Sequence, residues 1–116
     1  FQEDRLFPSL TALGNVSLVS DETTARRLLD LVGLHGSEDK YPDELSGGMS
    51  RRVAIARALA YGGDALILDE PFKGLEAELK EHIGKLISEY AQTKPVIIVT
   101  HDEYGKSLTK NSVILS

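Results

Sequence analysis

One stretch of the chain combines residues suited to binding an anion. It is Ser46-Gly47-Gly48-Met49, directly before a segment with helical periodicity. Ser46 is a favourable N-cap, and the two glycines let another group approach the backbone closely. The N-terminus of a helix carries partial positive charge and free N–H donors. The stretch therefore predicts an anion site with phosphate as the obvious ligand, although ordinary helix capping explains the same residues equally well.

A second stretch offers two adjacent carboxylates. The apolar run Ala65–Leu68 ends in Asp69-Glu70-Pro71. A buried strand delivers its last residues to the carboxyl edge of a sheet, where α/β proteins bind ligands. The β-branched run Val96–Thr100 is typical of a strand buried on both faces, and His101-Asp102 follows at its end. The alternative for the acidic pair is a polar strand end that only caps the following turn.

Helical periodicity surrounds both stretches. Apolar spacing and capping residues indicate one helix that begins after Asp21 and ends at Gly33. A second helix is expected from Gly48 to about Tyr61, where Gly62-Gly63 end it. A third helix follows residue 76 and ends before Lys94-Pro95. The residues expected to be buried on these helices are Ala25, Leu28, Leu29 and Val32 on the first, Val53, Ala56, Leu59 and Ala60 on the second, and Leu79, Ile83, Leu86, Ile87 and Tyr90 on the third. For Arg51, Arg52 and Arg57 the default expectation is solvation, and the alternative is electrostatic support of the phosphate site. Thr11 is a candidate cap for a short helix carrying Leu13 and Val16.

Composition limits the classes of protein to consider. The chain has 116 residues, the length of one small domain, with 41% apolar and 27% charged residues. It contains no cysteine, so disulfides and thiolate metal sites are excluded. The net charge is −5 with both signs interspersed, which argues against a general nucleic-acid surface.

The order and spacing of these motifs resemble those of the ATP-binding-cassette (ABC) ATPases. The family's signature Leu-Ser-Gly-Gly-Gln corresponds here to Leu45-Ser46-Gly47-Gly48-Met49. The family continues with Arg-Val-Ala-Ile-Ala-Arg-Ala-Leu, which stands here at residues 52–59, and with a Walker B strand ending in Asp-Glu-Pro, here Asp69-Glu70-Pro71. The resemblance covers nearly the whole chain.

The resemblance implies an α/β fold: part of a P-loop NTPase with a RecA-like parallel sheet and an ABC helical subdomain. Residues 1–9 would hold a strand end and the Q-loop, 10–62 the helical subdomain, and 63–116 the later part of the RecA-like core. The sequence lacks the phosphate-binding loop Gly-x-x-x-x-Gly-Lys-Ser/Thr. We interpret the chain as the later part of a longer subunit, inactive by itself. In the family the missing loop's strand lies beside the His101 strand, so a bare sheet edge that favours association is expected there.

The resemblance also assigns roles to residues. Glu70 would activate the attacking water, His101 would contact the γ-phosphate, and Gln2 would bind magnesium or that water. Asp69 would hold Mg²⁺, and Ser46, Gly47, Gly48 and Met49 would bind ATP held by an opposite subunit. Gly74, Leu75 and Glu76 occupy the D-loop, although Glu76 replaces the usual aspartate.

The implied function is that of the ATP-binding and ATP-hydrolysing subunit of an ABC importer, most like those for nitrate, sulfonate or related small solutes. Its expected partners are a second ATP-binding subunit, stacked head to tail, and a transmembrane permease. Its expected location is cytoplasmic, on the inner face of the cell membrane, with no nucleic acid bound. The alternatives are a DNA-repair or chromosome ATPase of the ABC type and a non-catalytic domain that kept the fold.

Overall fold

The computed structural model describes residues 5–103 and the backbone of residues 112–115. The chain divides into two compact units, Phe1–Tyr61 and Gly62–Ser116. Among the described residues, no helix is both long enough and apolar enough to cross a membrane.

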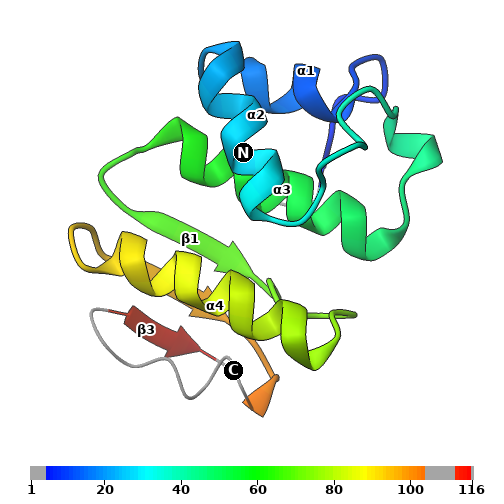
Figure 1. The fold of residues 1–116 in the computed structure, drawn as a ribbon. Helices are drawn as coiled ribbons and strands as arrows, with labels where there is room; N and C mark the ends of the chain where they lie inside the picture. Colours follow the sequence, from blue (N-terminus) through cyan, green and yellow to red (C-terminus); the bar gives the residue numbers. More distant parts are fainter. Residues whose placement is uncertain (1–4, 104–111, 116) are drawn as a thin grey trace. The chain divides into compact units, whose positions relative to one another are not determined.

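The first unit is helical (Figure 1). Its elements are α1 (Ala12–Ser17), α2 (Glu22–Leu31), the short 3-10 helix η1 (Pro42–Glu44) and α3 (Gly47–Tyr61). Helices α1, α2 and α3 pack against one another in pairs. Their contact surface buries an aliphatic core: Ala12, Val16, Ala25, Leu28, Leu29, Val32, Leu34, Val53, Ala54, Ile55 and Ala56.

Helix α1 is held at its start by side chains. The hydroxyl oxygen of Thr11 accepts from the Gly14 N–H at 3.0 Å, so the predicted cap is confirmed. Asn15 is fully buried, and its Oδ1 accepts from the Phe7 N–H at 2.8 Å. Its Nδ2 lies 3.0–3.2 Å from the carbonyl oxygens of Phe7, Leu10 and Thr11. A single amide side chain therefore fixes the irregular segment before α1.

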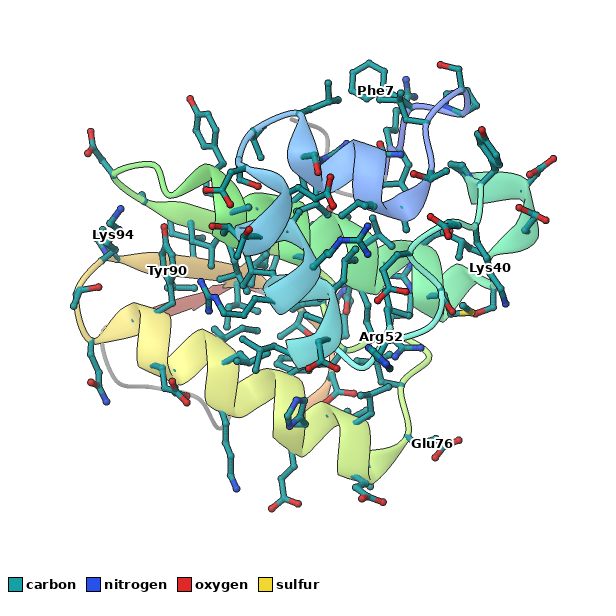
Figure 2. All side chains as sticks on the ribbon, turned by 45° about the horizontal axis from the view of Figure 1, so that its top comes forward. Phe7, Lys40, Arg52, Glu76, Tyr90 and Lys94 are labelled. Carbon is teal, nitrogen blue, oxygen red and sulfur yellow. The ribbon has the colours of Figure 1, made fainter. Side chains whose placement is uncertain are left out.

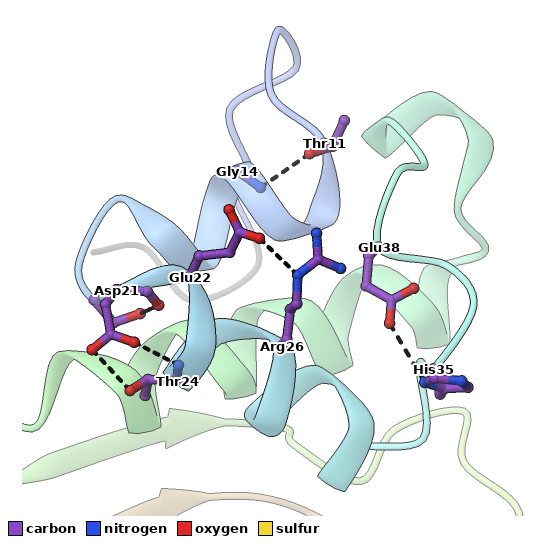
Figure 3. Close-up of polar contacts among 9 residues, drawn as sticks. Thr11, Gly14, Asp21, Glu22, Thr24, Arg26, His35 and Glu38 are labelled. Carbon is purple, nitrogen blue, oxygen red and sulfur yellow. Dashed lines mark hydrogen bonds and ion pairs between the residues drawn. The ribbon is translucent and has the colours of Figure 1, made fainter.

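Helix α2 begins and ends as the sequence predicts. The Asp21 carboxylate accepts from the Thr24 N–H at 2.7 Å, and this hydrogen bond lowers the pKa of Asp21 (Figure 3). Glu22 and Arg26 form an ion pair one turn apart on the exposed face. Gly33 follows the helix with φ +81°, a left-handed conformation that glycine adopts without strain.

Helix α3 runs from Gly47, one residue earlier than predicted, to Tyr61. Val53 and Ala56 are buried as expected, whereas Leu59 and Ala60 are only half-buried. The prediction that Arg57 is solvated is wrong, because its side chain is 1% exposed and its Nη2 donates to the Arg5 carbonyl at 2.8 Å. Burial lowers the pKa of Arg57. The periodicity of a helix identifies an inward face, but neighbouring loops decide which long polar side chains that face also buries.

Arg52 is also engaged with the protein rather than solvated. Its Nη1 donates to the carbonyl oxygens of Val32 and Gly33, at 3.1 and 3.3 Å, just after the C-terminus of α2 (Figure 2). The last carbonyls of a helix have no partner within it, and the negative end of the helix favours a cation. Arg52 thus joins α3 to the end of α2.

Replacing Arg52 by alanine should lower the free energy of unfolding of the protein by about 1–3 kcal/mol, because charged hydrogen bonds to these carbonyls are lost. Urea titration measures this change. The matched control is Arg27→Ala, which removes an exposed arginine from α2 and should shift stability by no more than about 0.5 kcal/mol. Equal destabilisation by both substitutions would contradict the capping role.

The second unit contains a parallel sheet. Its strands are β1 (Leu66–Asp69), β2 (Val96–Val99) and β3 (Ser112–Leu115), in the order β1-β2-β3. The register pairs Asp69 with Val99 and Val99 with Leu115. The expectation of a bare edge beside the His101 strand is wrong, because β3 pairs with β2 on that side. A strand edge presents unpaired N–H and C=O groups, and a later segment of the same chain satisfies them here.

The strands are less completely covered than predicted, both the buried strand expected at Ala65–Leu68 and the strand expected to be buried on both faces at Val96–Thr100. Leu66 and Leu68 are buried, but Ile67 between them is 53% exposed. Val96 and Ile98 are buried, whereas Ile97 and Val99 are half-buried. Apolar composition indicates a strand, but the elements that pack against the sheet decide how well each face is covered.

Helix α4 (Ala77–Ala91) connects β1 to β2 and packs against β2. It buries Ile83 and Ile87, as the periodicity predicts, while Leu79, Leu86 and Tyr90 are half-buried. At its C-terminal end, the Lys94 ammonium lies 5.7 Å from the centre of the Tyr90 ring (Figure 2). This contact lies just before the start of β2, and the parallel register with β1 then brings the ends of both strands to the same edge of the sheet, where the candidate site lies.

Candidate active site

The glycine-rich stretch begins helix α3. The Ser46 hydroxyl accepts from the Met49 N–H at 3.1 Å, and the Ser46 carbonyl accepts from the Ser50 N–H at 2.9 Å, so the predicted cap is confirmed. Ser46 and Gly47 are exposed. A Cβ atom built on Gly47 would meet nothing within 4 Å. The fold of this chain leaves room there for a side chain, which makes the glycine a point where an outside group can approach the backbone.

The two carboxylates lie at the carboxyl end of β1. Asp69 ends the strand with an exposed side chain. Glu70 follows with φ +48°, in the left-handed region that non-glycine residues seldom occupy. Its N–H donates to the Val99 carbonyl at 2.7 Å, so the ladder to β2 continues through this unusual residue. Such backbone outliers concentrate at functional sites.

The Glu70 side chain turns toward the end of β2. Its Oε1 accepts from the His101 N–H at 3.0 Å, and its Oε2 accepts from the Thr100 hydroxyl at 3.2 Å. A carboxylate offers about four lone-pair sites, so the donors from Thr100 and His101 leave room for a further hydrogen bond from water. The Glu70 carboxylate is therefore fixed in position by two hydrogen bonds and can still accept a proton.

His101 lies beside this carboxylate with an exposed side chain. It borders an open hollow of about 710 Å³ in the second unit. The hollow is lined by Ala77, Lys80, Glu81, His101, Asp102 and Glu103. An imidazole at the end of a strand, next to a fixed carboxylate, can donate a hydrogen bond to a bound anion.

The predicted D-loop forms a tight turn before α4. Gly74 has φ +78°, which favours glycine, and Leu75 is buried. Glu76 is exposed at the N-cap of α4 and carries no capping hydrogen bond from its side chain (Figure 2). The turn thus directs a carboxylate into solvent rather than into the fold of its own chain.

The carboxylates of Asp69 and Glu70 suit a Mg²⁺ ion that takes few of its ligands from the protein. No cluster of three or more His, Cys, Asp or Glu side chains within the described part of the chain could hold a metal ion by itself. Mg²⁺ usually binds through one or two carboxylates, with phosphate oxygens and waters completing its shell. The exposed Asp69 carboxylate beside Glu70 fits that pattern.

The structure brings Asp69, Glu70 and His101 together at one edge of the sheet of the second unit, while Ser46–Met49 belong to the first unit. Gln2 lies outside the described residues. Thr100 was not identified from the sequence as a site residue, although its hydroxyl contacts Glu70. The available signal was a small polar residue at the end of an otherwise aliphatic strand.

Residues 1–73 match the family described as ABC transporter. The chain belongs to the ABC transporter family. This match covers both the signature at 45–49 and the acidic pair at 69–70. Family membership agrees with the motif order that the sequence shows and with the parallel sheet that the structure shows.

Curated ABC relatives include importer subunits. The chain is 44% identical over 110 residues to the aliphatic sulfonates import ATP-binding protein SsuB of Bacillus subtilis strain 168, covering 88% of this chain and 43% of that protein. It is 40% identical over 127 residues to the sulfate/thiosulfate import ATP-binding protein CysA 2 of Chromobacterium violaceum, covering 100% of this chain and 35% of that protein. The chain therefore spans less than half the length of these relatives.

Solved ABC cassettes share the fold. A dimeric post-hydrolysis state of the ATP-binding cassette MJ0796, bound to ADP and Pi, matches with a TM-score of 0.82 and 31% identity, covering 100% of this chain and 56% of that chain. A dimeric structure of MJ0796, a bacterial ABC transporter cassette, matches with a TM-score of 0.76 and 32% identity, covering 99% of this chain and 56% of that chain. The expected fold class, α/β of the P-loop NTPase type, is confirmed.

Proposed function

We propose that the subunit containing this chain hydrolyses ATP to drive import of a small sulfur oxyanion, with aliphatic sulfonates as the leading class. The observation that carries the ATPase proposal is the Glu70 carboxylate, fixed at the carboxyl end of β1 by donors from the end of β2. The importer proposal rests on the names of the relatives, which are sulfonate and sulfate import proteins.

The residues divide the work of phosphoryl transfer, in which a protein mainly positions groups and stabilises charge. Glu70 accepts a hydrogen bond from the attacking water and takes its proton. The exposed imidazole of His101 donates to the γ-phosphate. Asp69 and Gln2 would hold Mg²⁺, which would supply positive charge to the phosphate oxygens when bound.

Ser46, Gly47, Gly48 and Met49 complete the site from a second subunit. The N-terminus of α3 offers N–H donors and partial positive charge, and Gly47 leaves its surroundings open. The related cassette structures are dimers, which supports a pair of ATP-binding subunits. In the proposed pair the subunits stack head to tail, and each signature meets the ATP of the other subunit. Gly74, Leu75 and Glu76 form the D-loop, with the Glu76 carboxylate directed outward toward that partner. The two ATP-binding subunits are attached, on the cytoplasmic side of the membrane, to a transmembrane permease.

Transport by the full-length subunit and its permease in sealed vesicles tests the proposal. Uptake of a radiolabelled alkanesulfonate should require ATP, and Asp69→Asn should reduce ATP hydrolysis and uptake by at least about tenfold through weaker metal binding. The matched control is Asp64→Asn, which makes the same charge change at an exposed turn before β1 and should have no effect.

Two results would count against this function. Hydrolysis that is normal in Asp69→Asn would remove this carboxylate from the metal site. ATP-dependent uptake of an uncharged solute, with no uptake of sulfonate or sulfate, would overturn the assignment of the solute class.

A further inference from the structure

We infer that Thr100 is a positioning residue for the Glu70 carboxylate. An ion pair between Lys80 and Asp102 keeps the Thr100 hydroxyl in its working orientation. This inference rests on the proposed function, because it assigns a role to Thr100 in the reaction that Glu70 performs.

The Thr100 hydroxyl has a defined direction. Its side chain is fully buried at the end of β2. The oxygen accepts from the Asp102 N–H at 2.9 Å, and the hydroxyl donates to Glu70 Oε2 at 3.2 Å. A hydroxyl has one hydrogen to donate, and the N–H occupies a lone pair of its oxygen. The backbone hydrogen bond therefore orients the single O–H toward the carboxylate.

The second oxygen of Glu70 is held from the same segment. The His101 N–H donates to Oε1 at 3.0 Å, so consecutive residues contact both oxygens of one carboxylate. Two donors on two oxygens fix the plane of the group as well as its position. Glutamate has several rotatable bonds, and catalysis requires its carboxylate within a fraction of an ångström of the productive place.

An ion pair supports this segment from helix α4. Lys80 Nζ donates to Asp102 Oδ2, and the two side chains are 26% and 18% exposed. Lys80 is the fourth residue of α4, where the positive end of the helix disfavours a cation. The Asp102 carboxylate offsets that cost and ties the first turn of α4 to the residue whose N–H orients Thr100.

The test uses the full-length subunit and compares Thr100→Val with Thr100→Ser. Valine keeps the shape but removes the hydroxyl, whereas serine keeps the hydroxyl but removes the methyl group. Thr100→Val should lower kcat by about 10- to 100-fold, with little change in KM for ATP, because the carboxylate is misplaced while ATP binding is unaffected. Thr100→Ser should retain most of the wild-type kcat.

Thermal unfolding of both variants separates positioning from packing. A merely structural role for Thr100 predicts that kcat follows stability, so that the serine variant, which loses buried apolar volume, would be at least as impaired as valine. A folded Thr100→Val enzyme with wild-type kcat overturns the inference. A serine variant as slow as the valine variant also overturns it.

A separate experiment tests the ion pair between Lys80 and Asp102, and it remains informative if the Thr100→Val variant does not fold. Lys80→Met should lower kcat, and the matched control Lys85→Met, at an exposed position of the same helix, should not. Because both residues act through one carboxylate, the effects of Lys80→Met and Thr100→Val should combine less than additively. Unchanged kcat in Lys80→Met overturns the role of the pair.

Failure of the inference can be told from failure of the proposed function. An inactive Glu70→Gln enzyme together with a fully active Thr100→Val enzyme overturns the positioning role alone. A Glu70→Gln enzyme with normal turnover overturns the role of Glu70 and, with it, the role of Thr100.

Discussion

Glu70→Gln in the full-length subunit is expected to lower ATP turnover by about 10³-fold while ATP still binds. Glutamine matches the size of glutamate but cannot take a proton from water. Its amide oxygen can still accept from the His101 N–H, and its NH₂ group can donate to the Thr100 oxygen, so the loop geometry should survive. The change therefore removes the chemistry of the site and leaves its architecture in place.

Steady-state phosphate release and equilibrium binding of labelled ATP measure the two halves of this expectation. The matched control is Glu89→Gln, which makes the same substitution at an exposed position near the end of α4 and should be fully active. Normal phosphate release by Glu70→Gln would remove Glu70 from the mechanism. Loss of ATP binding together with turnover would make Glu70 a binding residue rather than a base.

Gly47→Asp should abolish the ATP-bound dimer of the full-length subunit without weakening the monomer. The first turn of α3 favours an acidic residue, and a Cβ at position 47 meets nothing within 4 Å, so the folded monomer should be as stable as the wild type or slightly more stable. A γ-phosphate presented by the partner would instead face a carboxylate. Two unit charges roughly 4 Å apart repel by about 4 kcal/mol at an effective dielectric constant near 20, which is a loss of about 10³-fold in affinity.

Light scattering with a non-hydrolysable ATP analogue measures dimerisation, and thermal unfolding of the protein measures monomer stability. Gly47→Ala is the matched control for the added Cβ, since it brings no charge and should impair the dimer less than aspartate. Normal dimerisation of Gly47→Asp would refute binding of ATP across the dimer. Ser46 would then remain as an ordinary helix cap.

Local features of the sequence were sufficient to predict where helices begin and end. Asp21 and Ser46 accept from the N–H groups of Thr24 and Met49, as capping rules require, and Gly33 takes the left-handed conformation of a helix stop. These features are predictable because each depends on residues within one turn of the chain. The order of motifs was likewise sufficient to identify the family.

Burial of individual side chains was less predictable. The sequence predicts that Arg57 is a surface cation. Its side chain is instead buried, and its guanidinium donates a hydrogen bond to the carbonyl oxygen of Arg5, 52 residues away in sequence. Ile67 reads as core, yet it is 53% exposed. Both outcomes depend on which distant segment packs against an element, and periodicity within that element carries no information about the partner.

The sequence by itself determined which chemical groups are available: in the second unit two carboxylates after one strand and a histidine after another, and in the first unit a capped glycine pair before a helix. The tertiary structure alone decided how they are held. Parallel pairing of Asp69 with Val99 brings the ends of β1 and β2 to the same level, and the left-handed backbone of Glu70 turns its carboxylate onto Thr100 and His101. Register and backbone conformation arise from contacts about 30 residues apart in sequence, and such contacts form only when the sheet and α4 pack together.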